Sequence, residues 1–203
     1  MPVKDTILNR QDKAYRHART DVVIVQREVH IKYKKSYGGM SPYIRGIMGR
    51  EHARLLYTIC DKAEDHDDLK PLRFQVPRAD CPECYAPTHW QELPGDTRFI
   101  VETFSTAVDL AGISFMDQLP VTVAWIKAVL PDDENTEVDT LVAGMVHSED
   151  YKKLKKGDDV RPVFRKNPVS NASDVMWVLL GTAVEKFPSG YVESKNYRVQ
   201  KNF

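Results

Sequence analysis

Apolar and polar residues alternate along several short segments in the second half of the chain, and this period of two is typical of β-strands. The segments are residues 99–107, 120–130, 138–146, 159–165 and 174–184. A short helix is predicted over residues 148–156, with Ser148 as its N-cap and Gly157 at its end. Gly144, inside a predicted strand, indicates a bulge or a close approach to the backbone. Five strands with a helix before the fourth predict a small Greek-key barrel of the OB type.

One further strand pattern lies near the N-terminus. Apolar residues fall mostly on alternate positions between residues 21 and 35, which predicts a half-buried strand of about a dozen residues. Such a strand either belongs to the chain's own sheet or adds to the edge of a partner's sheet. Residues 1–20 are polar, so we expect them to be extended or ordered only against a partner.

A helix is predicted between this strand and the first cysteine. Ser41 is its expected N-cap, Pro42 its first helical residue and Tyr57 its approximate end. Its apolar face consists of Ile44, Ile47, Met48 and Leu55. Gly46 and Gly49 weaken the helix, and they indicate either close packing against another chain or a loose helix.

The charge is balanced overall but unevenly distributed. The chain has 29 Lys or Arg and 29 Asp or Glu, whereas residues 1–50 carry eleven basic and four acidic residues. This basic segment is either a solvated tail or a surface for an acidic partner, nucleotide phosphates or nucleic acid. The longest apolar runs are too short to span a bilayer, and the first ten residues lack the apolar core of a secretory signal. We therefore expect a cytoplasmic protein without membrane contact.

Three cysteines form the clearest chemical motif. Cys81 and Cys84 flank a Pro-Glu turn, and two thiolates at this spacing can bind one tetrahedral metal ion. Cys60 precedes them, but Ala63 stands where its partner cysteine is expected. A closed zinc shell needs a fourth ligand, for which His66 is the best candidate.

Two alternatives to this ligand set remain. Asp65 or Asp67 is the next candidate for the fourth position. The ribbon around the cysteines can also hold together by apolar packing without a metal, through Leu72, Phe74, Val76 and Trp90.

Three stretches together resemble a known family. SPYIRGIMGREHARLLYTIC, then RFQVPRADCPECY, then a barrel containing DYKKLKKGDDVRPVF are similar to the zinc-ribbon plus OB-fold proteins that accompany thiolases, over roughly residues 22–182. The resemblance implies a mainly β protein with a degenerate rubredoxin-like zinc ribbon, an OB-fold barrel and an N-terminal strand and helix extension. The chain departs from the family in two ways: the first knuckle has one cysteine, and the segment between Cys60 and Cys81 is longer and acidic.

The resemblance also implies a function. Such proteins are non-catalytic subunits of acyl-CoA acyltransferase complexes that form or cleave carbon–carbon bonds, including acetoacetyl-CoA thiolase, benzoylsuccinyl-CoA thiolase and thiolase-like aldolases. We expect a thiolase-superfamily catalytic subunit as the partner, in a heterotetramer or larger hetero-oligomer. The partner would bind most of the coenzyme A thioester, and zinc would be structural.

The expected parts are an arm with a strand (1–40), a docking helix (41–58), a ribbon-like knuckle (59–92), the barrel (93–185) and a C-terminal tail (186–203). The arm, the helix and the tail are the expected docking surfaces. The tail is expected to lie over a surface of the protein.

Two other classes of function are less well supported by the sequence. The six histidines are scattered, with no Ser-His-Asp order and no phosphate-binding glycine loop, so no catalytic residues are expected. A single-stranded nucleic-acid-binding barrel would need exposed aromatic residues in a basic groove. The barrel aromatics lie mostly among apolar neighbours and are interpreted as core: Phe99, Phe104, Trp125, Phe164 and Trp177. Nucleic acid is therefore not an expected partner.

Overall fold

The chain forms two compact units, Met1–Ser36 and Tyr37–Phe203. The structure, a computed structural model, describes residues 12–16, 23–27, 38–108, 119–132, 136–147, 151–170 and 172–197. In the first unit, β1 (Asp12–Arg16) pairs antiparallel with β2 (Val23–Arg27) of the same chain. β2 covers five residues of the strand predicted over residues 21–35. The other positions of that predicted strand lie outside the described residues.

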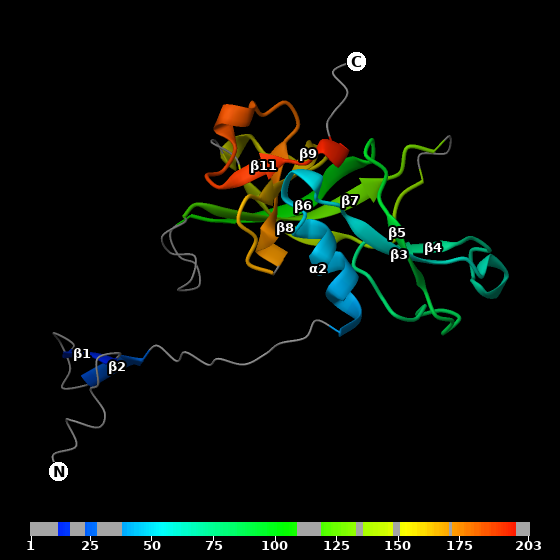
Figure 1. The fold of residues 1–203 in the computed structure, drawn as a ribbon, viewed down its shortest axis with the longest axis horizontal. Coiled ribbons are helices and arrows are strands. Elements are labelled where there is room, and N and C mark those ends of the chain that lie inside the picture. The colour runs from blue at the N-terminus through cyan, green and yellow to red at the C-terminus, as the bar shows by residue number, and fades with distance from the viewer. Residues whose placement is uncertain are drawn as a thin grey trace, which may run out of the picture. The chain divides into compact units, whose positions relative to one another are not determined.

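The second unit contains a closed five-stranded barrel (Figure 1). Its strands are β6 (Arg98–Ala107), β7 (Val121–Val129), β8 (Val142–His147), β9 (Asp159–Arg165) and β10 (Val175–Leu179). The strands β6, β7 and β8 form an antiparallel meander, β10 pairs parallel with β8 and antiparallel with β9, and β9 returns to β6. This connectivity closes the barrel in the order typical of an OB fold, so the predicted fold class is confirmed.

The barrel forms because its strands alternate inward apolar residues with outward ones. On β7, Ala124, Ile126 and Ala128 are fully buried, whereas Val123 and Trp125, at alternate positions, are exposed. The indole of Trp177 fills the interior and packs against Phe99, with ring centroids 4.9 Å apart. Burial of such aromatic side chains supplies much of the stability of a domain of this size.

Gly144 accommodates the buried indole of Trp177. A Cβ atom at residue 144 would overlap Nε1 of Trp177. The predicted close approach to the backbone at Gly144 is therefore confirmed, and the approaching group is a core side chain of the same barrel.

The predicted helix before β9 is shorter than expected. Only a 3-10 helix, η5 (Tyr151–Lys153), is described there, and residues 148–150 lie outside the described residues. The chain turns because the Asp158 carboxylate accepts a hydrogen bond from the Lys155 N–H, at 2.7 Å. Gly157, predicted to end this helix, lies four residues beyond the end of η5 in a turn, with a φ of 90°. Leu154 is buried in the core.

The helix predicted to run to Tyr57 ends ten residues earlier, as α2 (Ser41–Ile47). The Arg54 N–H donates to the Gly46 carbonyl at 3.0 Å, so the chain folds back on the helix. A Cβ atom at Gly46 would lie 2.6 Å from the Arg54 carbonyl oxygen, which means that this glycine packs against its own chain rather than another. The N-cap is Met40, without a side-chain capping bond, so the prediction of Ser41 as N-cap was wrong.

Ile44 and Ile47 lie in the core of their own chain, with exposed fractions of 8% and 0%. Their expected role as exposed docking residues is therefore wrong. The tail is similarly integrated: β11 (Tyr191–Glu193) pairs with β9, and Tyr197 is buried. The Tyr197 hydroxyl accepts a hydrogen bond, at 2.7 Å, from the N–H of Leu55, a residue that is distant from Tyr197 in the sequence.

A second, three-stranded sheet precedes the barrel. Its order is β4 (Leu72–Phe74), β3 (Leu56–Cys60), β5 (His89–Glu92), and both pairings are antiparallel. Short 3-10 helices connect the elements: η1 (Gly38–Met40), η2 (Arg50–His52), η3 (Ala63–Asp65), η6 (Ala172–Asp174), η7 (Val184–Lys186) and η8 (Lys195–Tyr197). Among the described residues no helix has the length and apolar character needed to cross a membrane.

We expect Gly144→Ala to lower the free energy of unfolding by about 1–3 kcal/mol, because the new methyl group collides with the buried Trp177 indole. Urea denaturation followed by tryptophan fluorescence measures the change. Gly39→Ala is the matched control, since a Cβ atom there meets nothing within 4 Å; equal effects of the two substitutions would contradict the packing argument.

Candidate metal centre

The four side chains predicted as metal ligands come from three different segments of the small sheet and its loops. Cys60 is the last residue of β3, and His66 follows η3 in the loop that leads to β4. Cys81 and Cys84 lie on the turn between β4 and β5. Because β4 and β5 both pair with β3, their loops converge at the end where Cys60 lies.

The turn that carries Cys81 and Cys84 has the hydrogen bonds of a tight knuckle. The Tyr85 N–H donates to the Cys81 carbonyl at 3.0 Å, and the Cys81 N–H donates to the Ala86 carbonyl at 2.9 Å. Tyr85 has a φ of 57°, which lets the chain reverse directly after Cys84. Both sulfur atoms are thereby directed toward the same point.

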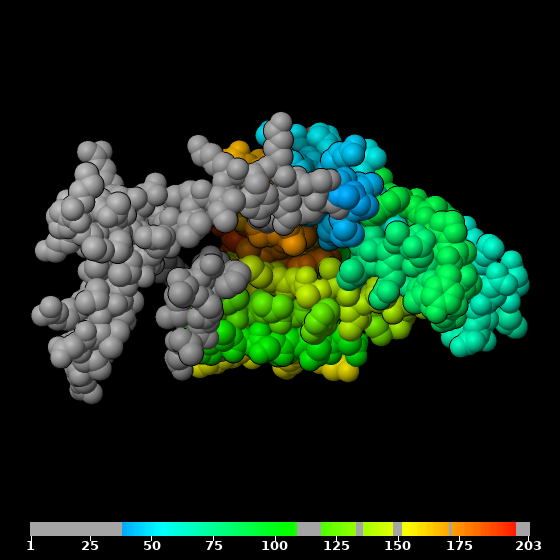
Figure 2. Space-filling model, turned by 90° about the horizontal axis from the view of Figure 1, so that it is seen from below, coloured from blue at the N-terminus to red at the C-terminus, as the bar shows by residue number. Residues whose placement is uncertain are grey.

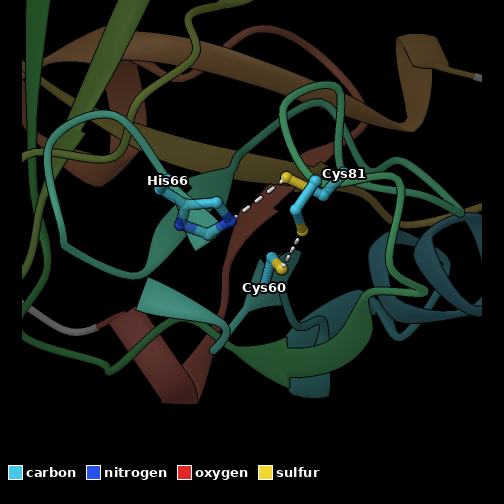
Figure 3. Close-up of side chains that lie close together, drawn as sticks. Cys60, His66 and Cys81 are labelled. Atoms are coloured by element: carbon cyan, nitrogen blue, oxygen red, sulfur yellow. Dashed lines mark hydrogen bonds between the residues drawn. The ribbon is translucent and has the colours of Figure 1, made fainter. Parts of the chain in front are cut away.

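The four ligand atoms form one cluster. One ligand atom from each of Cys60, His66, Cys81 and Cys84 lies within 4.8 Å of the other three. The Sγ atoms of Cys60 and Cys84 are 3.5 Å apart, and Cys81 Sγ lies 3.4 Å from His66 Nε2 (Figure 3). Exposed fractions are 1% for both Cys60 and Cys81 and 3% for His66.

A hydrogen bond orients the imidazole of His66. Its Nδ1 lies 2.7 Å from the Lys70 carbonyl oxygen. A carbonyl only accepts, so Nδ1 carries the hydrogen and Nε2 faces the sulfurs (Figure 3). Metal-ligating histidines commonly use the second ring nitrogen in this way.

The distances fit a tetrahedral zinc ion. With Zn–S of about 2.3 Å and Zn–N of about 2.0 Å, neighbouring ligand atoms would be separated by roughly 3.5–3.8 Å. The Cys60–Cys84 sulfur separation of 3.5 Å and the Cys81 Sγ–His66 Nε2 separation of 3.4 Å are close to this range. Three thiolates and one imidazole therefore make a group that can bind a metal such as zinc, with all four positions filled by protein ligands. A closed shell of this type stabilises structure and leaves no position for a substrate.

The surroundings shift the pKa values of the ligands in different directions. The Lys70 carbonyl raises the pKa of His66 to about 9, and burial raises the pKa of Cys60 to about 11. The Ala86 backbone N–H lowers the pKa of Cys84 to about 7. Around pH 8 without metal, His66 and Cys60 are therefore protonated, whereas Cys84 is largely a thiolate.

The alternative fourth ligands lie outside this cluster. Asp65 is exposed, and its Oδ2 lies 3.8 Å from the Lys62 Nζ. Asp67 is also exposed. Of the residues proposed to hold the ribbon by packing alone, Leu72 and Phe74 contact the buried cysteines, whereas Val76 is 43% exposed.

Two supporting groups were not foreseen from the sequence. One is the Lys70 carbonyl, which no side-chain pattern reveals. The other is Glu83, whose Oε2 accepts a hydrogen bond from the Asp67 N–H at 3.2 Å and joins the histidine loop to the cysteine turn. The sequence contained one signal for the role of Glu83, namely its position between Cys81 and Cys84.

The barrel aromatics follow the sequence interpretation with one exception. Phe99, Phe164 and Trp177 are almost fully buried, and Phe104 is partly buried. Trp125, in contrast, is 48% exposed on the outer face of β7. Lys127, two residues further along, is occupied by ion pairs with Glu102 and Glu137.

Comparison with known proteins gives structural likenesses at low sequence identity. No family model and no curated protein matches the chain. It is similar to a protein of unknown function of the DUF35 family from Sulfolobus solfataricus, with 14% identity, a TM-score of 0.46 and coverage of 72% of this chain and 89% of the other. It is also similar to an Ltp2-ChsH2(DUF35) aldolase, with 14% identity, a TM-score of 0.41 and coverage of 69% and 91%.

We expect about one zinc ion per chain after purification without chelators, and loss of that zinc in Cys81→Ser. Elemental analysis of the purified protein measures both. His89→Gln is the control, because His89 is an exposed histidine of the same small sheet whose nearest charged partner is Asp61. Equal zinc content in the wild type and Cys81→Ser would contradict the proposed ligand set.

Zinc affinity should rise with pH between about 7 and 9, because the metal displaces protons from His66 and Cys60. Displacement of these two protons alone predicts that the association constant rises by at least about two powers of ten per pH unit. Competition with a chromophoric chelator across this range measures the slope. A flat profile would contradict the assigned protonation states.

Proposed function

We propose that this chain is a non-catalytic accessory subunit of a thiolase-type complex that forms or cleaves a carbon–carbon bond next to an acyl-CoA thioester. The observation that carries the proposal is the order of parts: a ribbon with three cysteines and one histidine in a single cluster, joined to a closed OB barrel. These parts fall on the stretches whose sequence resembles thiolase-associated proteins. A thiolase-like aldolase is the alternative partner within the same class.

The chemistry of the reaction would come from the partner. A thiolase-superfamily subunit would supply the nucleophilic cysteine and the hydrogen-bond donors that stabilise the acyl intermediate. It would also bind most of the coenzyme A thioester. This chain would act in the cytoplasm as part of a heterotetramer or larger assembly, and zinc would stiffen its ribbon.

The proposed division keeps the ribbon (59–92) and the barrel (93–185) as separate parts. The ribbon's small core contains Cys60 and Cys81 beside three other buried residues, Leu72, Phe74 and Ala86. The barrel has a larger apolar core, which it shares with α2 and β3 and which is separate from the ribbon's small core. Loss of metal should therefore affect the ribbon far more than the barrel.

Single-stranded nucleic-acid binding is the rival from another class. The exposed Trp125 is the observation in its favour, because a base could stack on it. Against it, the neighbouring Lys127 is paired with two glutamates and offers little free positive charge. We expect no salt-sensitive binding to single-stranded oligonucleotides.

Co-expression with a thiolase-like protein encoded beside this chain should yield a complex that co-elutes in size-exclusion chromatography. Adding this chain should also raise the partner's acyl-CoA cleavage rate, because the complex is then complete. Absence of both effects would overturn the proposal. Fluorescence anisotropy with a labelled oligonucleotide tests the rival, and tight binding that weakens with salt would favour it.

A further inference from the structure

The ribbon ends in two loops that are joined to each other. The histidine loop and the cysteine turn are connected by the Asp67–Glu83 hydrogen bond of 3.2 Å and by the ligand cluster. Figures 1 and 2 both show this teal part of the ribbon at one end of the second unit. We call residues 67–69, 82, 83 and 85 the ribbon tip.

Two large apolar side chains project from the ribbon tip. Tyr85 is 80% exposed and Leu69 is 73% exposed, the highest values among the large apolar residues that the structure describes. Tyr85 directly follows Cys84, and the Leu69 N–H donates to the carbonyl of His66 at 3.1 Å. Both residues are thus held in place by the metal-binding loops.

The backbone does not require either side chain. Leu69 has a φ of 50° and Tyr85 a φ of 57°. Glycine adopts this region without strain, whereas bulky residues rarely do. The fold alone would favour glycine at both positions, so the presence of leucine and tyrosine points to a role outside the fold.

The charge around these side chains is acidic. Residues 61–70 contain five Asp or Glu and two Lys. Lys62 pairs with Asp65, and Lys70 with Asp68 and Asp139. Within the described part of the chain, neither Asp67 nor Glu83 has a lysine or arginine at ion-pair distance. The surface is therefore an apolar centre with an acidic rim.

We infer that the ribbon tip is the docking surface for the catalytic subunit, and that it enters an apolar pocket rimmed by lysine or arginine. The inference rests on the proposed function, because it names where the partner binds. Tyrosine is enriched among residues that dominate binding energy, and a complementary charged rim accelerates association. The metal centre would then serve the interface by fixing both loops.

The test combines Leu69→Gly and Tyr85→Gly in the full-length chain. Both changes remove the side chain while favouring the observed backbone, so zinc content and melting temperature should stay at least at wild-type values. Affinity for the co-expressed thiolase-like subunit should fall by about tenfold or more, as measured by biolayer interferometry. Arg50→Gly is the matched control, since Arg50 is exposed with a φ of 58° but lies in η2.

Glu83→Gln isolates the charge, because the amide oxygen can still accept the Asp67 N–H. It should slow association and reduce its dependence on ionic strength. If the double variant binds as the wild type does, the ribbon tip is not the interface, while the accessory function stands. If Trp125→Ser weakens the complex and the double variant does not, the conclusion is again that the ribbon tip is not the interface and that the accessory function stands. If the wild type binds no thiolase-like subunit, the proposed function and this inference both fail.

Discussion

The ribbon depends on the convergence of three sulfur atoms and one imidazole nitrogen. Its own apolar core contains Leu72, Phe74 and Ala86, with Cys60 and Cys81 completing the cluster. A core of this size supplies little hydrophobic stabilisation, and small units of this kind usually need a metal or a disulfide. The ligand atoms within 4.8 Å of one another meet that need, since a bound cation would tie β3, the histidine loop and the cysteine turn together.

The barrel is stabilised in a different way. Aromatic residues fill its interior, and Gly144 leaves room for Trp177 on the β8 side. Tyr197 connects barrel and ribbon, because its buried hydroxyl lies within hydrogen-bond distance of the backbone of Leu55 and Leu93. These two residues precede β3 and follow β5, so the base of the ribbon is attached to the barrel core while its tip is free to meet another surface.

In this arrangement, the candidate metal ligands and the side chains proposed for docking are different residues. The predicted ligand atoms all lie in one cluster, and a closed shell would leave no position for a substrate. The side chains that point outward, Leu69 and Tyr85, occupy backbone positions that glycine would adopt more easily. In the proposed complex, the metal centre would fix an interface, and the partner would perform the catalytic chemistry.

The strand pattern predicted the barrel well. The residues of β9 were predicted without error, and the other barrel strands differ by a few residues at their ends. The end of α2 was predicted wrongly because the Gly46 carbonyl accepts a hydrogen bond from the Arg54 N–H. Helical periodicity does not encode this contact. The exposure of Trp125 was missed because an apolar run does not reveal which side of a strand faces water.

The sequence by itself determined the strand segments of the barrel and the candidate ligands, because hydrophobic period and cysteine spacing are local properties. Only the tertiary structure decided that His66 reaches the three sulfurs, that its Nδ1 is held by Lys70, and that Tyr85 and Leu69 project from joined loops. Each of these depends on strand pairing that brings residues distant in sequence to one end of the small sheet.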